Sequence, residues 1–287
     1  MQNSYHRVLT DLDDTGFGVI LEDHPRHYIP PHWHEAMELL LFVHGTVTCN
    51  FSNATLRGRP GEIYLINSHD VHQTRCTRNA VYLCLHIQPS RMCQYVPNFD
   101  RLSFSLIHDP ADQEKAAAYE SLREHMQEIL VQLRESPQAA GLECQARLFS
   151  ITALLVKHFS TPLALEENRI HRSDISRLEP LLEHVQLHHG EELTLDYAAN
   201  MIGVNKEYFC RLFKKNMGVS YLQYVNQVRA TAVCRELETS DDPISVIAER
   251  HGFTSPKMLN QYFRELYGCT PSEKRKAFRE ILLENLG

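Results

Sequence analysis

Residues 248–270 read Ala-Glu-Arg-His-Gly-Phe-Thr-Ser-Pro-Lys-Met-Leu-Asn-Gln-Tyr-Phe-Arg-Glu-Leu-Tyr-Gly-Cys-Thr. A similar stretch precedes them by 50 residues, at 198–220. Each stretch predicts a helix, a turn that contains glycine, and a second helix with a polar outer face. Two copies at a fixed spacing are much rarer by chance than one, so a repeated helix-turn-helix unit is predicted. The recurring positions include Ala198 with Ala248, Phe213 with Phe263, and Gly218 with Gly268.

The repeat resembles the C-terminal domain of AraC/XylS-type transcription regulators over roughly residues 174–280. This resemblance implies a domain that binds DNA with the second helix of each unit in the major groove. Gln261 departs from the pattern, since the family usually has arginine there. The motifs that carry the resemblance are Ile244-Ser245-Val246-Ile247-Ala248, Gly252-Phe253, Phe263, Gly268-Cys269-Thr270-Pro271 and, between the copies, Arg229-Ala230-Thr231-Ala232.

The two expected recognition helices begin at good capping residues. Asn205 caps the first helix, while Ser255 caps the second and Pro256 takes its first position. Helical spacing then separates an inner apolar face from an outer polar face. The inner face is expected to hold Tyr208, Phe209, Leu212 and Phe213 in the first helix, and Leu259, Phe263 and Leu266 in the second.

The outer faces carry the predicted DNA contacts. Arg211 suits guanine, and Asn260 or Gln261 suits adenine. Phosphate contacts are expected from Lys214, Lys215 and Arg264. A solvated polar face is the ordinary alternative for any single helix. The full set is Lys206, Glu207, Cys210, Arg211, Lys214, Lys215, Lys257, Asn260, Gln261 and Arg264.

The segment 221–238 predicts one long helix that joins the two units, with Leu222, Val225 and Val228 among its apolar positions. Such a connector would set the two reading helices about 34 Å apart, one turn of B-DNA. Charge follows the same plan. Residues 174–287 contain 14 Lys+Arg and 16 Asp+Glu, yet basic residues predominate in and beside the recognition helices. Positive charge is therefore expected where the domain faces phosphate.

The N-terminal half contains a second pair of motifs. Short apolar runs at 38–43, 47–51, 62–66 and 81–85, separated by turn residues, predict a small barrel or sandwich. The stretch His32-Trp33-His34-Glu35-Ala36-Met37-Glu38, with six residues between it and Gly45, is similar to the first cupin motif. Asn67-Ser68-His69-Asp70-Val71-His72, with five residues between Gly61 and it, is similar to the second, with Asn67 and His69 where cupins usually have proline and glycine.

The cupin resemblance implies a ligand site in the barrel. In metal-binding cupins the corresponding residues are metal ligands, and three imidazoles with a carboxylate suit Zn, Fe, Ni or Mn. In AraC-type regulators the same barrel often holds an organic effector without a metal. We expect the latter, with a sugar as the class that family habit suggests. The expected effector site is His32, Trp33, His34, Glu38, Tyr64 and His72, and the alternative metal site is His32, His34, Glu38 and His72.

Two other functions stay open at this point. One is a metal-dependent cupin enzyme with an appended DNA-binding domain, although no acid/base pair or nucleophile triad is found that demands catalysis. The other is a regulator whose barrel answers to a partner protein. The histidines could also be hydrogen-bonded structural residues, and Trp33 could serve packing.

The composition fits a soluble protein of two ordinary domains, since 43% of the 287 residues are hydrophobic and 23% are charged. No apolar run approaches the roughly 20 residues of a membrane span. The N-terminus has no apolar core of a secretion signal. We therefore expect a cytoplasmic protein whose eight cysteines are reduced thiols.

We predict a multidomain α+β protein with four parts. These are an effector-binding barrel at 1–108, a helical segment at 109–160, a polar linker at 161–173 and the DNA-binding domain at 174–287. The helical segment either caps the barrel or forms the interface of a homodimer, and it is expected to transmit the ligand signal. The resemblance implies promoter DNA, a small-molecule effector and RNA polymerase as partners, with no cofactor and no catalytic residues.

Overall fold

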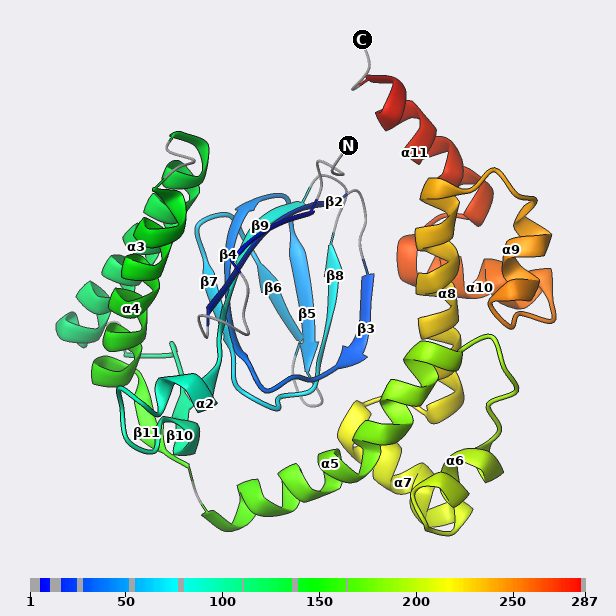
Figure 1. The fold of residues 1–287 in the computed structure, drawn as a ribbon, viewed down its shortest axis with the longest axis horizontal. Coiled ribbons are helices and arrows are strands. Elements are labelled where there is room, and N and C mark those ends of the chain that lie inside the picture. Colours follow the sequence, from blue (N-terminus) through cyan, green and yellow to red (C-terminus); the bar gives the residue numbers. More distant parts are fainter. Residues whose placement is uncertain are drawn as a thin grey trace.

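The computed structural model describes residues 6–10, 17–24, 28–51, 55–76, 80–109, 111–135, 139–163 and 165–284. Strands build the N-terminal half and helices build the C-terminal half, as the sequence predicts (Figure 1). The chain is therefore a multidomain α+β protein. Within the described ranges, every helix is too short or too polar to span a lipid bilayer.

Two antiparallel sheets form the N-terminal barrel. One has the strand order β1-β2-β9-β4-β7, and the other has the order β3-β8-β5-β6. The four apolar runs predicted as strands correspond to β4, β5, β7 and β9. The bounds are β1 His6–Thr10, β2 Phe17–His24, β3 Tyr28–His32, β4 Met37–His44, β5 Val47–Phe51, β6 Thr55–Gly58, β7 Ile63–Ile66, β8 His72–Cys76 and β9 Ala80–Ile87.

Strand β4 is buried on both faces, which explains its unbroken apolar run. Leu40 and Phe42 point into the barrel and pack with side chains of both sheets. Leu39 and Leu41 point the other way, into a core shared with two helices. Alternation along one strand thus separates the barrel interior from a second, outer core.

The outer core is covered by α3 (Gln113–Glu135) and α4 (Ala140–His158), which lie on the side of the barrel away from the C-terminal half (Figure 1). Leu122 and Met126 of α3 are fully buried there, as is Leu148 of α4. The helical stripes predicted from the sequence therefore serve packing against the five-stranded sheet. Short elements connect this layer: α2 (Pro89–Met92), a 3-10 turn (Phe99–Arg101), β10 (Leu102–Phe104) and β11 (Ser160–Pro162).

The segment 161–173 is not the irregular linker that we expected. Strand β11 pairs with β10, and helix α5 begins at Leu165 and continues to His188. The segment lacks apolar periodicity, which is the main signal of a packed helix, but Glu, Leu and Arg all favour helix formation. A helix therefore leads from the barrel into the C-terminal half (Figure 1).

The C-terminal half contains two helix-turn-helix units, α6–α7 and α9–α10, joined by α8. Val225 and Val228 of α8 are buried, whereas Leu222 is 46% exposed and does not belong to the predicted apolar face. The side-chain oxygen of Asn205 accepts from the Tyr208 amide at 2.8 Å, as predicted for a cap. Ser255 holds the capping position without a capping hydrogen bond, ahead of Pro256. The bounds are α6 Leu195–Met201, α7 Lys206–Met217, α8 Tyr221–Thr239, α9 Ile244–Arg250, α10 Pro256–Tyr267 and α11 Pro271–Glu284.

Candidate functional site

The outer faces of α7 and α10 lie open to solvent. In α7 all six predicted contact residues are exposed, and in α10 Lys257, Gln261 and Arg264 are exposed while Asn260 is half-buried. The Asn260 amide nitrogen donates to the Pro256 carbonyl at 3.0 Å, which leaves its side-chain oxygen available. Tyr208 was expected on the inner face but is 37% exposed, because it lies at the edge of the apolar stripe.

The predicted basic contacts fall into two groups. Lys206 is paired with Asp196 at 2.7 Å, and Lys215 with Asp174 at 3.0 Å. The other group forms no ion pair within the described part of the chain, so its charge is available to a ligand. Its members are Arg211, Lys214, Lys257 and Arg264.

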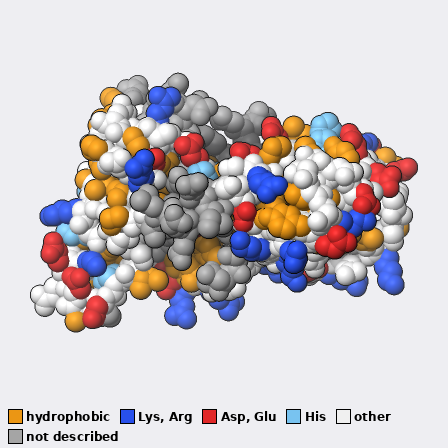
Figure 2. Space-filling view, turned by 90° about the horizontal axis from the view of Figure 1, so that it is seen from below, with side chains coloured by type: hydrophobic (Ala, Val, Ile, Leu, Met, Phe, Trp, Pro, Cys, Tyr) orange, Lys and Arg blue, Asp and Glu red, His pale blue; other side chains and the backbone are white. Residues whose placement is uncertain are grey.

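Several other basic residues are used inside the C-terminal half. Arg250 pairs with Glu236 and Asp242, and Arg279 pairs with Asp241. Local charge counts from the sequence therefore overstate the charge available to phosphate. In the view from below, Lys and Arg side chains lie along the lower margin of the half that holds the helix-turn-helix units, with acidic side chains mostly above them (Figure 2).

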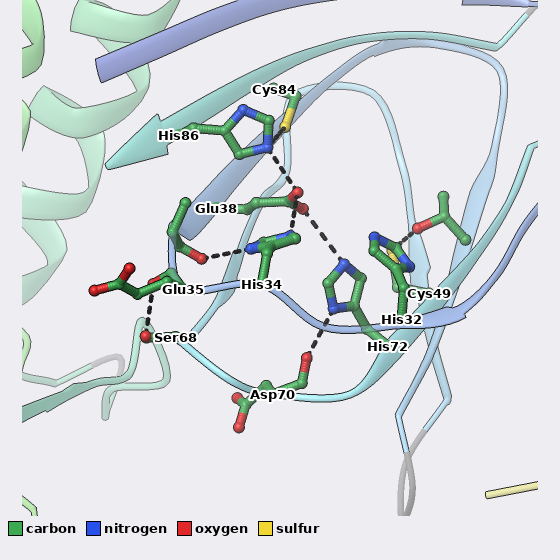
Figure 3. A network of polar contacts seen from close by, with 12 residues as sticks. His32, His34, Glu35, Glu38, Cys49, Ser68, Asp70, His72, Cys84 and His86 are labelled. Atoms are coloured by element: carbon green, nitrogen blue, oxygen red, sulfur yellow. Dashed lines mark hydrogen bonds and ion pairs between the residues drawn. The ribbon is translucent and has the colours of Figure 1, made fainter. Parts of the chain in front are cut away.

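The histidine motifs converge inside the barrel, as the sequence predicts (Figure 3). Strand register explains how: His32 of β3 lies opposite His72 of β8. The ring centroids of His32 and His72 are 4.2 Å apart, and those of His34 and His72 are 5.2 Å apart. One side-chain ligand atom from each of His32, His34, Glu38 and His72 lies within 4.8 Å of all the others.

Each of these three histidines is held by its Nδ1 atom. The Nδ1–H groups of His32, His34 and His72 donate to the carbonyls of Pro30, Ala36 and Asp70 at 3.0, 2.7 and 2.8 Å. A carbonyl can only accept, so each Nδ1 carries a proton, and each ring, when neutral, turns an Nε2 lone pair toward the cluster. Metal-binding histidines are commonly oriented in this way.

Glu38 occupies the centre of the cluster and is 8% exposed. Its Oε1 atom lies 2.8 Å from Nε2 of His34 and 2.8 Å from Nε2 of His86, while Oε2 lies 3.7 Å from Nε2 of His72. The Nε2 atom of His34 is buried without a hydrogen-bond partner of suitable geometry. A lone pair facing a carboxylate at this distance requires a second proton or a cation between the two groups.

The electrostatics of the cluster favour neutral rings at His32 and His72 beside a charged carboxylate. At His34 burial would lower the pKa, but the hydrogen bond and charge of Glu38 outweigh that effect and raise it. Burial, with His72 close by, lowers the pKa of His32 to about 3. Burial also lowers the pKa of His72. Burial alone would raise the pKa of Glu38, but its contacts with His34 and His86 outweigh that effect and hold the pKa well below its usual range.

Two neighbours of the cluster were missed in the sequence. His86 lies opposite Glu38 in the β4–β9 register, and the Sγ atom of Cys84 lies 3.6 Å from Nε2 of His86. Together with Glu38 they form a second group able to hold a metal ion. The alternation of Tyr82, Cys84 and His86 along β9 is the signal that could have revealed them.

The two departures from the second cupin motif have structural roles. His69 adopts φ +65°, in the left-handed region where glycine is the usual residue. Its amide donates to the His34 carbonyl at 2.9 Å. Asn67 exchanges hydrogen bonds with the Phe104 backbone, at 3.0 and 2.8 Å, and so ties β10 to the barrel.

Trp33 and Tyr64 lie apart from the histidine cluster. Trp33 alternates with His32 and His34, and it packs outward against the core of α5, α7 and α8, 5.2 Å from the His69 ring. Tyr64 packs against Phe42 in the barrel interior at 4.9 Å. The sequence placed both residues in one effector site, but only Tyr64 faces the inside of the barrel.

The barrel docks onto the helix-turn-helix half through residues next to the cluster. Val71, beside His72, is buried against Ile175 and Leu178 of α5. Tyr28, on the same strand as His32, is 1% exposed. Its ring packs edge-on against the ring of Tyr267 of α10, with the ring centroids 6.4 Å apart. Cluster residues and docking residues are therefore close neighbours along the chain, on β3, on β8 and in the residues directly next to them.

Comparisons with known proteins match both halves. A model of the AraC-like ligand binding domain matches residues 16–152, and a model of a helix-turn-helix domain matches residues 198–277. The chain is 22% identical over 262 residues to the HTH-type transcriptional activator RhaS of Enterobacter sp. (strain 638), covering 88% of this chain and 89% of that one. It is 24% identical over 266 residues to RhaS of Escherichia coli O1:K1 / APEC, with coverage of 88% and 89%.

A solved structure supports the fold of the whole chain. ToxT from Vibrio cholerae superposes with a TM-score of 0.51 and 12% identity over 91% of this chain and 98% of that one. At this identity the likeness concerns the fold alone. It includes both the barrel and the helix-turn-helix half.

Proposed function

This chain is a DNA-binding transcription regulator of the AraC family, and we propose that both of its recognition helices read promoter DNA. The observation that carries the proposal is the pair of open polar faces on α7 and α10, whose basic residues Arg211, Lys214, Lys257 and Arg264 have no acidic partner in the described ranges. The joining helix α8 has 19 residues, about 28 Å at 1.5 Å per residue. That length suits two helices in successive major grooves.

Base contacts are proposed for Arg211 and Asn260. We expect Arg211→Ala and Asn260→Ala each to cost about 1–3 kcal/mol of binding free energy and to relax base preference in different grooves. Lys214→Ala should weaken binding to all sequences alike. We choose Lys214 because Lys215 is held by Asp174. The measurement is a titration on the selected duplex, meaning a duplex that the full-length chain selects from a random-sequence pool, and on random DNA.

Equal losses on the selected duplex and on random DNA for all three variants would show that the base-reading face is assigned wrongly. Thermal unfolding of each variant provides the control for folding, since these side chains are at or near the surface and their removal should leave stability within about 0.5 kcal/mol.

We propose further that the ligand of the barrel is a divalent transition-metal ion. Three Nε2 atoms and the Glu38 carboxylate face one another in a buried site, and Nε2 of His34 lies only 2.8 Å from Oε1 of Glu38. His32, His34, Glu38 and His72 would hold the ion, and this donor set suits Zn²⁺, Fe²⁺, Ni²⁺ or Mn²⁺. Apart from the cluster, the barrel interior contains packed apolar side chains such as Leu40 and Phe42. This filling favours a small ligand over a sugar.

A bound metal would supply positive charge that holds the four donors together. The same donors would also serve the metal-dependent enzyme considered from the sequence. The relatives are named as transcriptional activators, which favours a regulatory role. A turnover screen of the metal-loaded protein tests the enzymatic alternative.

The docking interface offers the route from the barrel to the DNA-binding helices. We had expected helices at 109–160 to transmit the signal, but α3 and α4 cover the opposite side of the barrel (Figure 1). Strands β3 and β8, with the residues directly next to them, instead carry ligands inward and the docking residues Tyr28, Trp33 and Val71 outward. A ligand that prefers one arrangement of these strands would shift the equilibrium between docked and undocked states.

Assembly and partners complete the proposal. We infer a homodimer that forms through α3 and α4. Three apolar side chains of these helices, Val131, Leu142 and Phe149, are 50%, 78% and 38% exposed. Analytical ultracentrifugation of the full-length chain tests the oligomeric state. By analogy with the RhaS proteins we infer an activator that works in the cytoplasm and contacts RNA polymerase. A promoter-reporter assay distinguishes activation from repression.

A further inference from the structure

A turn that precedes the first helix-turn-helix unit touches the turn of the second unit. The first turn, 189–191, follows α5 and leads into the first unit. The second, 250–252, lies between α9 and α10. A Cβ atom at Gly190 would lie 2.7 Å from the Arg250 carbonyl oxygen, a distance that real Cβ atoms essentially never show. Gly252 has φ +80°, and a Cβ atom there would lie 2.9 Å from the His189 carbonyl oxygen. The contact therefore depends on glycine on both sides.

A pair of histidines connects the same two turns. Nδ1 of His189 donates to the Gln186 carbonyl at 3.0 Å, and Nε2 of His189 lies 2.9 Å from Nδ1 of His251, within hydrogen-bond distance. The two rings are stacked, with centroids 5.1 Å apart and an interplanar angle of 21°. Nε2 of His251 lies 2.7 Å from Oε2 of Glu236.

The connecting helix α8 holds both turns. Nε of Arg229 donates to the His189 carbonyl at 2.7 Å, and a terminal nitrogen donates to the Glu191 carbonyl at 2.8 Å. Two turns further along α8, Glu236 contacts His251 and Arg250 of the second turn. One side of α8 thus anchors both units. The sequence motif at Arg229 is therefore explained by a role inside the domain, since its donors are directed to backbone carbonyls.

We propose that this contact sets the spacing and relative orientation of the two recognition helices. We call it the inter-unit clasp, formed by His189, Gly190, Arg229, Glu236, His251 and Gly252. Helix α10 begins a few residues after the second turn, so movement of that turn would redirect the helix. The inference rests on the proposed function, because it requires that α7 and α10 read one duplex.

The clasp should affect DNA affinity, because the two recognition helices are linked in one chain. Once one recognition helix is bound, the second binds as an intramolecular event whose effective concentration depends on geometry. A loosened clasp lowers that concentration without changing either recognition face. Affinity for DNA with both half-sites should therefore fall, while affinity for one half-site should not.

The experiment compares full-length His251→Ala and Gly190→Ala with wild type on three duplexes. These are the selected duplex, a copy with one half-site scrambled, and a copy with one base pair inserted between the half-sites. The matched control is His188→Ala, because His188 is exposed and contacts Glu191 within its own turn. Melting temperatures identify any variant that fails to fold, and His251→Ala keeps the test valid if Gly190→Ala does not fold.

We expect both clasp variants to bind the selected duplex about tenfold more weakly and to bind the half-scrambled duplex within about twofold of wild type. They should also lose less affinity than wild type when the base pair is inserted. An equal loss on the selected and half-scrambled duplexes, or no loss on either, would overturn the inference. If wild type itself binds these two duplexes equally, reading by two helices fails, and the inference fails with it.

Discussion

A full-length His72→Ala variant is expected to bind Zn²⁺ and Ni²⁺ at least about 100-fold more weakly than wild type, because loss of a ligand should cost no less than loss of its supporting partner. His72 is 2% exposed, and its Nδ1–H group is fixed by the Asp70 carbonyl. Isothermal titration of each metal into chelator-treated protein measures the effect.

The control for this result lies on β4, in the other sheet of the barrel. His44 is exposed at the end of β4, outside the cluster, and His44→Ala should leave metal affinity unchanged. Wild type should also gain thermal stability with added metal by mass action, whereas His72→Ala should not. Equal metal affinity for wild type and His72→Ala would contradict the metal site, and an organic ligand would then be the better interpretation of the barrel.

The Trp33→Ala variant tests whether metal binding and the effect of metal on DNA affinity depend on different residues. Trp33 packs against the core of α5, α7 and α8, and it faces away from the ligands on either side of it. This variant should bind metal as wild type does but lose the change in DNA affinity that metal causes. A variant that loses neither would show that the docking interface does not carry the signal.

Raising the salt concentration from about 50 to 200 mM is expected to weaken binding to the selected duplex by about 10³-fold. With Arg211 assigned to a base, five basic residues on α7 and α10 are available to phosphates, including Lys206 and Lys215 once DNA displaces their acidic partners. Each neutralised phosphate releases counterions and adds about 0.9 to the slope of log affinity against log salt. Titrations at four or five salt concentrations give the slope.

Single variants test this explanation of the slope. Lys214→Ala should lower the slope by about one. Lys276→Ala is the matched control, because Lys276 lies on α11, outside both recognition helices, beside Glu280. A slope near zero for wild type would contradict binding through the phosphate backbone, and a slope unchanged by Lys214→Ala would remove that residue from the contact surface.

The features that could be predicted from the sequence are those determined by local patterns. The repeated turn with Gly218 or Gly268 after a recognition helix is one, since glycine adopts φ 73° and 68° there and ends each helix. The convergence of His32 and His72 is another, because the two cupin motifs fix their strands. The cap at Asn205 depends only on residues three positions apart.

The features that were missed depend on contacts between distant segments. His86 is 48 positions from Glu38, and only the β4–β9 register brings them together. The outward role of Trp33 depends on where the C-terminal half docks, which no pattern in the barrel encodes. Helix α5 was missed because its polar start has no apolar stripe. Arg229 matched the family motif, but its acceptors, the carbonyls of His189 and Glu191, lie on another turn.

The most direct test of the central claim is a hydroxyl-radical footprint of the full-length chain on the selected duplex. Two helices that read one face of DNA should protect two segments about one helical turn, or roughly 10 base pairs, apart. Arg211→Ala should weaken one segment first, and Asn260→Ala the other. A single protected segment, or protection that neither variant changes selectively, would contradict the account.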